Sequence, residues 1–328
     1  MSGSPELAVL LAVAIDLVVG DPRWLPHPVR AMGAVATGCE WLARRFIRPP
    51  RLAGVVCVLL VLGLCGGTAA GLLVLAWKVQ PVAGLVVAAL MIYSMIAIHD
   101  MLKHSRAVYR ALMAGALAEA RAKVGLIVGR DTQDLDEAGV ARAAVESVAE
   151  SLVDGVTAPL FYALVFGPVG AVVYRASNTM DSMFGHQDER YREFGWAPAR
   201  LDDLLNYLPA RLTAPLLCLV AAVLARRGRA AWRILRRDGR QHDSPNAGLP
   251  EAAMAGALGV RLGGRNYYDG EALDKPTIGD AETPLVAAHI ERANRLFLVT
   301  ALAFVALGLA GRAGLLRAIA PYLRFGGS

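Results

Sequence analysis

The sequence is short of charge. Only 19% of its 328 residues are charged and 55% are hydrophobic, whereas ordinary soluble domains carry roughly 25% charged residues. The mean hydropathy is +0.44. This balance argues against a soluble globular domain and predicts a membrane protein.

Cysteine is also scarce, and the few that occur are scattered. The four cysteines have no metal-ligand spacing: Cys39, Cys57, Cys65 and Cys218. Three of them lie within or beside apolar runs, where cysteine behaves as a small hydrophobic residue. Neither a disulfide framework nor a zinc site is indicated. No positively charged region precedes the first apolar run, so we expect no cleavable signal peptide.

Two patterns typical of nucleotide or nucleic-acid binding are missing. The net charge is +6 and the isoelectric point about 9.3, but no basic stripe is interleaved with aromatic residues, so nucleic-acid binding is not expected. The sequence has no Gly-x-x-x-x-Gly-Lys-Ser/Thr loop, so any ATP would be held by another arrangement. The arginines cluster instead beside apolar runs, a pattern typical of cytoplasmic loops in membrane proteins.

Six apolar runs are expected to form the membrane-embedded part. They cover residues 7–19, 53–76, 82–98, 155–174, 207–225 and 296–311. The first run is marginal against the ~20 residues that a crossing helix needs. The polar segments 99–150 and 226–295 are expected in the cytoplasm, because arginines are dense at the start of the second one. The sequence thus predicts an all-α, polytopic integral-membrane helical bundle in one domain, with amphipathic or re-entrant helices.

The run 155–174 is interrupted by Gly167-Pro168, which should break or kink a helix. One bent span and a re-entrant hairpin are both compatible with this interruption. A full crossing would place Asn178 and Asp181 on the opposite side from Glu150, whereas a hairpin would bring them together. We favour the hairpin, or a deep intramembrane fold.

Two further helices are expected before this run. Residues 99–128 have the pattern of an amphipathic helix, with apolar residues on one face and basic residues elsewhere. The next helix should begin with Asp134 as its N-cap, because Glu137 follows three residues later as in a capping box.

The second of these helices carries three carboxylates on one face. Glu146, Glu150 and Asp154 are spaced four residues apart. Like charges at this spacing cost about 0.2–0.5 kcal/mol per pair. A bound cation or an arginine would remove that cost, so the stripe is a candidate for Mg²⁺ or substrate binding. A solvated acidic stripe is the alternative.

The other polar residues that could form a functional site each have an ordinary structural explanation as well. His27 lies among prolines that hold the backbone extended, and an ordinary loop histidine fits the same pattern. His242 and Asp243 could polarise each other for acid–base chemistry, although Asp243 could equally cap a turn. Gly263-Gly264 followed by Arg265 could hold a phosphate, but an ordinary turn is favoured.

Several short blocks of the sequence are more specific together than alone. They are Gly20-Asp21-Pro22, His27-Pro28-Val29-Arg30, Glu146-Ser147 through Asp154-Gly155, Ala158-Pro159-Leu160-Phe161, Asn178-Thr179-Met180-Asp181-Ser182-Met183, Ala199-Arg200-Leu201-Asp202-Asp203, Pro209-Ala210-Arg211 and His242-Asp243-Ser244-Pro245-Asn246. In content and order they resemble the CobD/CbiB family of cobalamin biosynthesis. Ser151 departs from the family pattern, in which asparagine is usual at this position.

The resemblance implies an integral-membrane enzyme. It would join (R)-1-amino-2-propanol, or its O-phosphate, to the free carboxyl of adenosylcobyric acid through an amide bond. ATP is implied as the activating cosubstrate, with Mg²⁺ as its metal. Expected partners are these substrates, membrane lipid, a second copy of the chain and enzymes of the same pathway. The expected location is the bacterial inner membrane, multi-pass, with the active site on the cytoplasmic side.

The polar residues named above then take candidate roles. The expected metal ligands are Glu146, Glu150, Asp154, Asp181, Asp202 and Asp203. The expected catalytic residues are His27, Asp154, Asp181, His242 and Asp243, with one of the histidines deprotonating the incoming amine. The guanidinium and amide groups expected to bind substrate or phosphate are Arg30, Asn178, Arg200, Asn206, Arg211, Asn246 and Arg265.

Two other functional classes stay open at this point. A small-solute transporter would use intramembrane acids and broken helices, but it predicts internal repeats, and the two halves of the chain show none. A non-catalytic membrane sensor or assembly subunit could use the same scaffold, but such a protein would be expected to have lost the polar positions that are present here. The amide-forming ligase is favoured.

Overall fold

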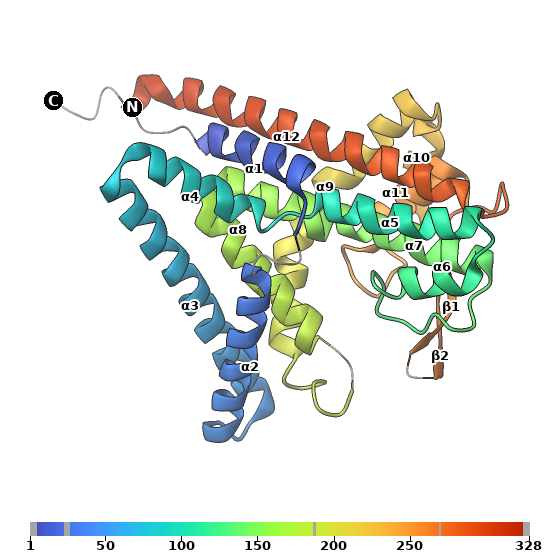
Figure 1. The fold of residues 1–328 in the computed structure, drawn as a ribbon, viewed down its shortest axis with the longest axis horizontal. Helices are drawn as coiled ribbons and strands as arrows, with labels where there is room; N and C mark the ends of the chain where they lie inside the picture. Colours follow the sequence, from blue (N-terminus) through green and yellow to red (C-terminus); the bar gives the residue numbers. More distant parts are fainter. Residues whose placement is uncertain (1–4, 23–26, 186–187, 269, 324–328) are drawn as a thin grey trace.

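The computed structural model describes residues 5–22, 27–185, 188–268 and 270–323. Within them the chain forms helices and one small antiparallel sheet (Figure 1). The helices in chain order are α1 (Pro5–Val19), α2 (Pro28–Phe46), α3 (Pro50–Val79), α4 (Pro81–Tyr93), α5 (Ile98–Met113), α6 (Leu117–Val124), α7 (Glu137–Leu152), the π-helical turn η1 (Val153–Thr157), α8 (Ala158–Phe184), α9 (Trp196–Leu224), α10 (Gly228–Asp238), α11 (Gly248–Leu258) and α12 (Ala288–Leu323). The strands β1 (Leu262–Tyr268) and β2 (Glu271–Ile278) lie between α11 and α12 in the chain.

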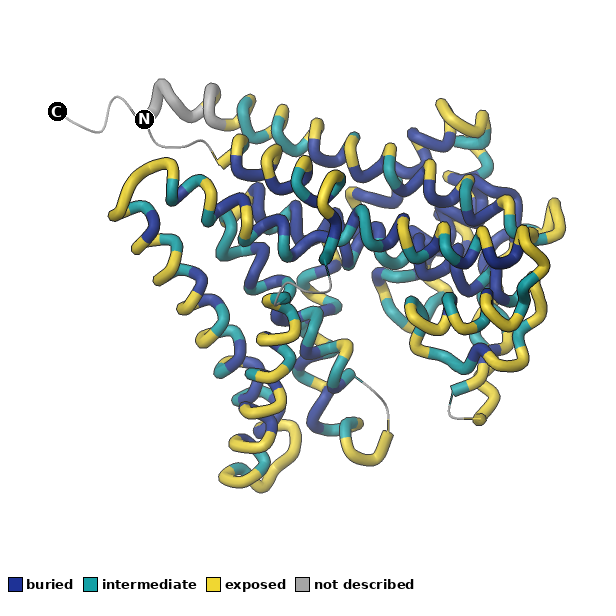
Figure 2. Tube along the Cα trace, in the orientation of Figure 1, coloured by how far each residue is buried: buried dark blue, intermediate teal, exposed yellow. Residues whose placement is uncertain are grey.

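Five helical segments are long and apolar enough to cross a membrane. They are Pro50–Val79, Pro81–Met113, Glu137–Phe184, Trp196–Leu224 and Ala288–Leu315. Many of their large apolar side chains face outward: on α3, Leu59, Leu64 and Leu75 are each more than half exposed (Figure 2). Apolar surface of this extent suits lipid rather than water. The predicted all-α polytopic bundle is confirmed.

The elements gather at two ends of the molecule (Figure 1). Helices α1 and α4, the turn between α3 and α4 and the C-terminal part of α12 lie at one end, and α3 runs from that turn down to α2 (Figure 1). Helices α5, α6, α10 and α11 and the β-hairpin lie at the other. Helix α7 leads from the second end toward the first, where α8 continues its direction before bending. The polar residues carried by α7 and α8 are thus positioned between the two ends.

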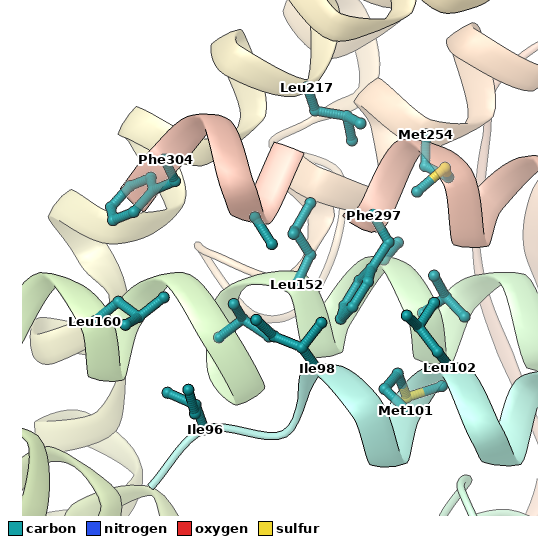
Figure 3. Packing of buried hydrophobic residues seen from close by; sticks show 14 of the residues in the cluster. Ile96, Ile98, Met101, Leu102, Leu152, Leu160, Leu217, Met254, Phe297 and Phe304 are labelled. Atoms are coloured by element: carbon teal, nitrogen blue, oxygen red, sulfur yellow. The ribbon is translucent and has the colours of Figure 1, made fainter. Parts of the chain in front are cut away.

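Helix α7 is at the centre of the packed core. From Val140 to Ala149 every residue except Arg142 is buried. Most of these residues are alanine or valine, and small side chains let neighbouring helices approach closely. Figure 3 shows side chains of α5, α9, α11 and α12 gathered around Leu152 at the end of the helix. Close packing on all sides holds the polar side chains of α7 in defined positions.

Two predictions about the segment before α7 are wrong. The expected single helix over residues 99–128 is divided into α5 and α6, because the chain turns at Gly115, whose φ is 69°. The N-cap of α7 is Asp136 rather than Asp134, since the Oδ1 atom of Asp136 accepts a hydrogen bond from the Gly139 N–H at 2.7 Å.

Helix α8 bends back sharply at Gly167. This residue has φ 73° and ψ −168°, a conformation essentially restricted to glycine. The two arms lie against each other: the rings of Tyr162 and Tyr174 stack with their centroids 5.3 Å apart. The Tyr174 hydroxyl oxygen also lies 3.4 Å from the Asp154 carbonyl oxygen. The bend returns the residues after 174 to the end of α7, which is the proximity that the hairpin alternative predicts; whether the segment crosses the membrane stays a prediction.

The antiparallel hairpin formed by β1 and β2 was not predicted. Gly263 and Gly264 both have positive φ, 74° and 84°, and the register of the sheet shifts between them, which defines a β-bulge. The Gly263 N–H donates to the Glu146 carboxylate at 2.7 Å. The glycine pair therefore shapes the strand over α7, and its first N–H is not available to a phosphate.

Candidate functional site

The first polar centre is a pocket of about 220 Å³ between α7, α11 and the β-hairpin, called here the α7–α11 pocket. One wall holds Glu150 of α7, Glu251 of α11 and His242, which precedes α11. One ligand atom from each of these residues lies within 4.8 Å of the others. Glu251 is only 3% exposed. Two carboxylates and an imidazole thus meet on the wall of this pocket, where Glu251 is buried and Glu150 and His242 are not.

The backbone holds His242 in one orientation. Its Nδ1 atom accepts a hydrogen bond from the Ser244 N–H at 3.0 Å, so the neutral ring carries its proton on Nε2. That Nε2 atom lies 3.7 Å from the Glu251 carboxylate. Burial lowers the pKa of His242, and the negative charge of Glu150 opposes this shift. The acid that His242 faces is Glu251, whereas the predicted partner Asp243 is exposed.

The α7–α11 pocket has walls of opposite charge. Burial raises the pKa of the Glu251 carboxyl well above its ordinary value, and the charges of Glu150 and Glu146 add to the shift. Lys275 of β2 lines the facing wall. Burial by itself would lower the pKa of Lys275, but the Tyr268 side chain and the nearby glutamates outweigh burial and raise it. Both the acidic and the cationic wall belong to residues far apart in the sequence.

Glu146, the first of the three predicted acids on α7, is occupied by structural partners. Its Oε2 atom accepts a hydrogen bond from Arg130 at 2.5 Å, and its Oε1 atom accepts one from the Gly263 N–H at 2.7 Å. Both side chains of the ion pair are nearly buried, at 7% and 10% exposure. Arg142, one turn before Glu146 on α7, donates to the Arg265 carbonyl at 2.9 Å. These contacts attach the β-hairpin to α7 and use both oxygens of Glu146.

Asp154, the third predicted acid, has different neighbours from Glu150. Asp154 lies inside the π-helical turn Val153–Thr157, whereas Glu150 lies in the last turn of α7. A π-helical turn takes in an extra residue and so changes which face the following side chains occupy. Asp154 interacts electrostatically with Asp202 of α9, next with Glu150 of α7, and more weakly with Asp181 of α8. Glu150 therefore lines the α7–α11 pocket, whereas Asp154 adjoins Asp202 while still interacting with Glu150.

Two asparagines hold Asp202 beside Asp154. The Nδ2 atom of Asn178 donates to Oδ1 of Asp202 at 3.2 Å, and the Nδ2 atom of Asn206 donates to Oδ2 at 2.9 Å. The Tyr174 hydroxyl donates to Oδ1 of Asn206 at 2.8 Å. The structure thus brings five predicted site residues together in a second centre, called here the aspartate–asparagine cluster: Asp154, Asn178, Asp181, Asp202 and Asn206.

Arg175 lies beside this cluster and was missed in the sequence. Its guanidinium group donates to the Met95 carbonyl at 3.0 Å and to Oδ1 of Asn178 at 3.2 Å. It also donates to the Gly155 carbonyl at 3.4 Å. A signal was present, because Arg175 directly follows a charge-free apolar run. An ionisable residue inside a membrane helix is a functional candidate by default.

A third centre is a pocket of about 410 Å³ next to Arg175, called here the α1–α2 pocket. Its Lys and Arg side chains are Arg30, Lys103 and Arg175. His27 also lines it, but both of its ring nitrogens are engaged. Its Nδ1 atom accepts from the Val29 N–H at 3.2 Å as the N-cap of α2, and its Nε2 atom lies 3.3 Å from the Asp21 carboxylate. The predicted His27 and Arg30 therefore share a pocket in which His27 also starts a helix.

Two predicted arginines lie at the surface, away from these centres. Arg200 is exposed, and its guanidinium lies 3.6 Å from the Asp203 carboxylate. Arg265 pairs with Asp274 across the β-hairpin at 2.8 Å, and both side chains are more than 60% exposed. Surface ion pairs of this kind contribute little to stability, and the structure does not bring either arginine to a pocket.

Arg211 and Asn246 join α9 to the segment that carries His242. The Arg211 guanidinium donates to Oδ1 of Asn246 at 3.1 Å. The Nδ2 atom of Asn246 donates to the Asp203 carbonyl at 2.7 Å. This link fixes the α7–α11 pocket relative to the aspartate–asparagine cluster.

The six predicted metal ligands do not converge on one point. Within residues 5–22, 27–185, 188–268 and 270–323, one set of three or more ligand atoms is close enough to hold a metal ion: Glu150, His242 and Glu251. This set fits a metal poorly, because His242 accepts a hydrogen bond at Nδ1 and carries its proton on Nε2. A metal-bound imidazole coordinates through one nitrogen and donates from the other.

Comparison with known proteins identifies the family. The family model described as "CobD/Cbib protein" matches residues 9–297. The chain is 51% identical over 279 residues to "Cobalamin biosynthesis protein CobD" of Geobacter metallireducens, covering 85% of this chain and 88% of that protein. It is 45% identical over 304 residues to the protein of the same name from Klebsiella pneumoniae, covering 92% and 95%. It is 43% identical over 312 residues to "Cobalamin biosynthesis protein CbiB" of Salmonella typhi, covering 94% and 98%.

No solved structure matches the chain. The family match spans most of the sequence, and the blocks that form the aspartate–asparagine cluster and the His242 segment lie inside it. The chain belongs to the CobD/CbiB family.

Proposed function

We propose that the chain acts in cobalamin biosynthesis as an amide-forming ligase. It would join 1-amino-2-propanol, or its O-phosphate, to the free carboxyl of adenosylcobyric acid at the expense of ATP. Membership of the family and the names of its relatives support the pathway. The observation that carries the proposal is the gathering of polar residues from separate segments around Glu150 and Asp154, with a pocket on either side.

The reaction takes two steps, activation of the carboxylate and attack by the amine. A carboxylate does not condense with an amine near pH 7 until one of its oxygens becomes part of a leaving group. In the first step a carboxylate oxygen attacks the γ-phosphorus of ATP, ADP leaves, and an acyl phosphate forms. In the second step the amine nitrogen attacks the acyl carbon, the bond to the phosphate oxygen breaks, and inorganic phosphate leaves. A base takes the proton that the amine loses.

Phosphoryl transfer is catalysed mainly by positioning and by cations on the phosphate oxygens. The α1–α2 pocket offers Arg30, Lys103 and Arg175 for this purpose, and it is also lined by the carboxylates of Asp16, Asp21 and Asp100. Arg175 touches the Gly155 carbonyl, so an anion bound to its guanidinium would lie beside Asp154. We therefore assign the phosphate and carboxylate groups to this side of η1.

Mg²⁺ typically uses one or two carboxylates together with substrate phosphates and water. Asp154 and Asp181 fit that requirement, because their carboxylates accept no hydrogen bond from the residues that the structure describes. When bound, Mg²⁺ would neutralise charge on the phosphate oxygens. The Asp202 carboxylate is less suited, since two asparagines already donate to it.

The proton acceptor is a carboxylate rather than a histidine in this arrangement. His27 and His242 each accept a backbone hydrogen bond at Nδ1, which leaves the proton of the neutral ring on Nε2. Glu251 faces the α7–α11 pocket, and its raised pKa makes it a stronger base than an ordinary carboxylate. Sequence analysis did not single out Glu251.

The proposal is tested by reconstitution. The full-length protein in detergent is incubated with adenosylcobyric acid, ATP, Mg²⁺ and aminopropanol phosphate, and the corrinoid is followed by mass spectrometry. We expect an amide product from wild type and a rate lower by at least about 100-fold in Asp154→Asn, the scale of losing one group that stabilises charge in the transition state.

Asp134→Asn is the matched control, because Asp134 is exposed on the loop before α7 and should leave the rate unchanged. Equal rates in Asp154→Asn and wild type would keep the ligase and remove Asp154 from its site. No amide from wild type with either the free or the phosphorylated amine would contradict the proposed function.

A further inference from the structure

A separate pocket of about 380 Å³ lies between the end of α9, the end of α11 and the beginning of α12, and is called here the α9–α12 pocket. Three arginines line it: Arg227, Arg292 and Arg295. Its other described lining residues are alanines and leucines, and none of them is acidic. The proposed ligase reaction uses none of these residues. The pocket therefore combines concentrated positive charge with an apolar lining, outside the centres described above.

Two of the three arginines have no acidic partner. Arg292 and Arg295 are exposed on α12, and among the described residues no carboxylate oxygen lies within 4.0 Å of either guanidinium group. Glu291, beside Arg292 in the sequence, pairs with Arg106 at 3.5 Å instead. Two guanidinium groups that share a pocket without an acid repel each other. Their placement therefore favours an anion that comes from outside the chain.

Arg227 is held in one position by other contacts. Its Nε atom donates to the Gly256 carbonyl of α11 at 3.1 Å, and its Nη2 atom donates to the Glu282 carboxylate at 2.7 Å. The Glu282 carboxylate also lies 3.7 Å from Arg233, so it neutralises the charge of Arg227 only in part. The excess charge of the pocket comes mainly from Arg292 and Arg295.

The pocket lies where two candidate membrane spans end. The span Trp196–Leu224 finishes at the pocket, and the span Ala288–Leu315 begins beside it. Long basic side chains near the ends of membrane helices place their charged groups at the membrane interface. The three guanidinium groups are therefore expected at the depth of the lipid phosphates.

Exposed apolar surface continues from the pocket along both spans. On α12, Val299 and Leu302 each follow one of the two unpaired arginines by seven residues, which places them on the same side of the helix, and they are 38% and 40% exposed. On α9, Leu219 and Val223 are 66% and 80% exposed. A charged recess beside exposed apolar helix surface fits an amphiphile, with its headgroup in the recess and its chains along the helices.

The chemistry of the pocket restricts the headgroup. The guanidinium fork matches the oxygens of a phosphate, and basic pockets between membrane helices bind the headgroups of anionic lipids. A volume of about 380 Å³ is about thirteen times the ~30 Å³ that a water molecule occupies in the liquid, which suits a glycerophosphate group and is too small for a corrinoid ring. A zwitterionic lipid would bring its own cation toward the arginines, so a lipid with net negative charge is favoured.

We propose that the α9–α12 pocket binds the headgroup of an anionic phospholipid, with Arg292 and Arg295 on the phosphate oxygens and the acyl chains along α9 and α12. The binding site has a structural consequence as well. Helix α11 lines the pocket through Ala257 and Leu258 and also carries Glu251. A bound lipid would thus fasten α11 to the two spans and stabilise the folded protein.

Lipid binding to the full-length protein in detergent tests the proposal. The protein is titrated with phosphatidylglycerol and, separately, with phosphatidylcholine of the same acyl chains, and native mass spectrometry counts the lipid molecules that stay bound. Glycerol 3-phosphate is added in a third arm as a competitor that has the phosphate but no chains. Size-exclusion profiles establish that each variant is folded, and melting temperatures with and without lipid measure the stabilisation.

Wild type should bind phosphatidylglycerol in preference to phosphatidylcholine and melt at a higher temperature with it. Arg292→Gln combined with Arg295→Gln should weaken binding of phosphatidylglycerol by at least about tenfold, the usual scale for one charge-assisted hydrogen bond, and should leave phosphatidylcholine within about twofold of wild type. Arg236→Gln combined with Arg240→Gln is the matched control. It removes the same charge from exposed positions outside the pocket and should bind as wild type does.

Three results would overturn the proposal. They are equal binding of the two lipids by wild type, an equal loss in the pocket and control variants, which would show an effect of diffuse surface charge, and displacement of the lipid by an equal concentration of glycerol 3-phosphate, which would make a free phosphate the occupant. The proposed function is judged separately by amide formation. A protein that binds the lipid in the predicted pattern but forms no amide would keep the lipid site and reject the ligase.

Discussion

Two neighbouring buried acids, Glu146 and Glu251, have opposite electrostatic surroundings. Glu146 has an arginine at 2.5 Å and a backbone N–H at 2.7 Å, so its charge is balanced inside the protein. Glu251 is as well buried, but the groups within 4.8 Å of it are another carboxylate and an imidazole, and Lys275 on the facing wall offsets its charge only in part. Burying an acid without a cationic partner is unfavourable. A residue kept in such a position is better explained by ligand binding than by stability.

Replacing Glu251 should therefore stabilise the empty protein, and the gain should depend on pH. The pKa of the Glu251 carboxyl is raised by burial above the value of about 4.3 in an unfolded chain. The folded state then binds the proton more tightly, and the stability that this provides is present below pH 4 and lost as pH rises through the folded pKa. Glutamine cannot ionise, so Glu251→Gln avoids that loss.

We expect the free energy of unfolding of Glu251→Gln at pH 8 to exceed that of wild type by about 1 kcal/mol, which raises the melting temperature. The difference should shrink toward pH 4.5. Thermal unfolding in detergent, followed by circular dichroism, measures it. Glu146→Gln is the contrasting variant and should destabilise at pH 8, because it weakens the bond to Arg130. A pH-independent difference for Glu251→Gln would contradict this account.

At the scale of elements, two irregular turns in one long helical segment shape the polar centre. The π-helical turn Val153–Thr157 contains Asp154, which adjoins Asp202 of α9 and also interacts with Glu150 of α7. The bend at Gly167 returns α8 to the end of α7, where Asn178 meets Asp202. π-Helical turns often occur at functional sites, and here a regular helix would not place these groups together.

Gly167→Ala tests the second turn. No atom lies within 4 Å of the position that the new Cβ would take, so space is not limiting. The backbone conformation, φ 73° and ψ −168°, is the obstacle, and forcing a residue with a side chain into it costs of order 1–3 kcal/mol. We expect a lower melting temperature and a lower rate of amide formation.

Gly63→Ala in α3 is the matched control. Its Cβ also meets no atom within 4 Å, and its φ lies outside the left-handed region. Alanine in place of glycine inside a helix should be neutral or stabilising by about 0.5–1 kcal/mol. If Gly167→Ala behaved like Gly63→Ala in both measurements, the bend would not depend on glycine.

At the scale of the whole molecule, apolar and polar surfaces are separated. The outward faces of α3, α4 and α9 carry exposed leucines and valines. The β-hairpin and the turn between α3 and α4 lie at opposite ends of the molecule (Figure 1). Arginines are dense in α10 and just before it, close in sequence to the hairpin end, and such residues stay preferentially in the cytoplasm.

This arrangement predicts the orientation in the membrane. A cysteine introduced at Ala272, exposed in β2, should react with a membrane-impermeant maleimide in inverted vesicles and not in intact cells with a permeable outer membrane. A cysteine at Gln80, exposed between α3 and α4, should show the reverse pattern. The unmodified protein is the control for its own cysteines, three of which are buried. Labelling of both positions from the same side would contradict the predicted topology.

The sequence by itself determined the structural class of the protein, a helical membrane bundle, and much of the aspartate–asparagine cluster. Long apolar runs set the helical bundle, because the bilayer leaves the backbone few other ways to satisfy its hydrogen bonds. The break at Gly167-Pro168 could also be predicted from the sequence, because the backbone conformations open to glycine and proline depend on those residues themselves. The blocks that carry Asp154, Asn178 and Asp202 were recognisable as a family pattern, and the structure places them together.

Only the tertiary structure decided how these groups are paired. Glu146 and Gly263 are separated by 117 residues, so no helical period reveals that Glu146 supports the hairpin and not a metal. Glu251, Asn266 and Lys275 lie in no recognised block, yet they complete the α7–α11 pocket. Helical periodicity is a local property of the chain, whereas the charge that a buried acid meets depends on segments brought to it by folding. That is why the acidic stripe of α7 was visible in the sequence and the different partners of its members were not.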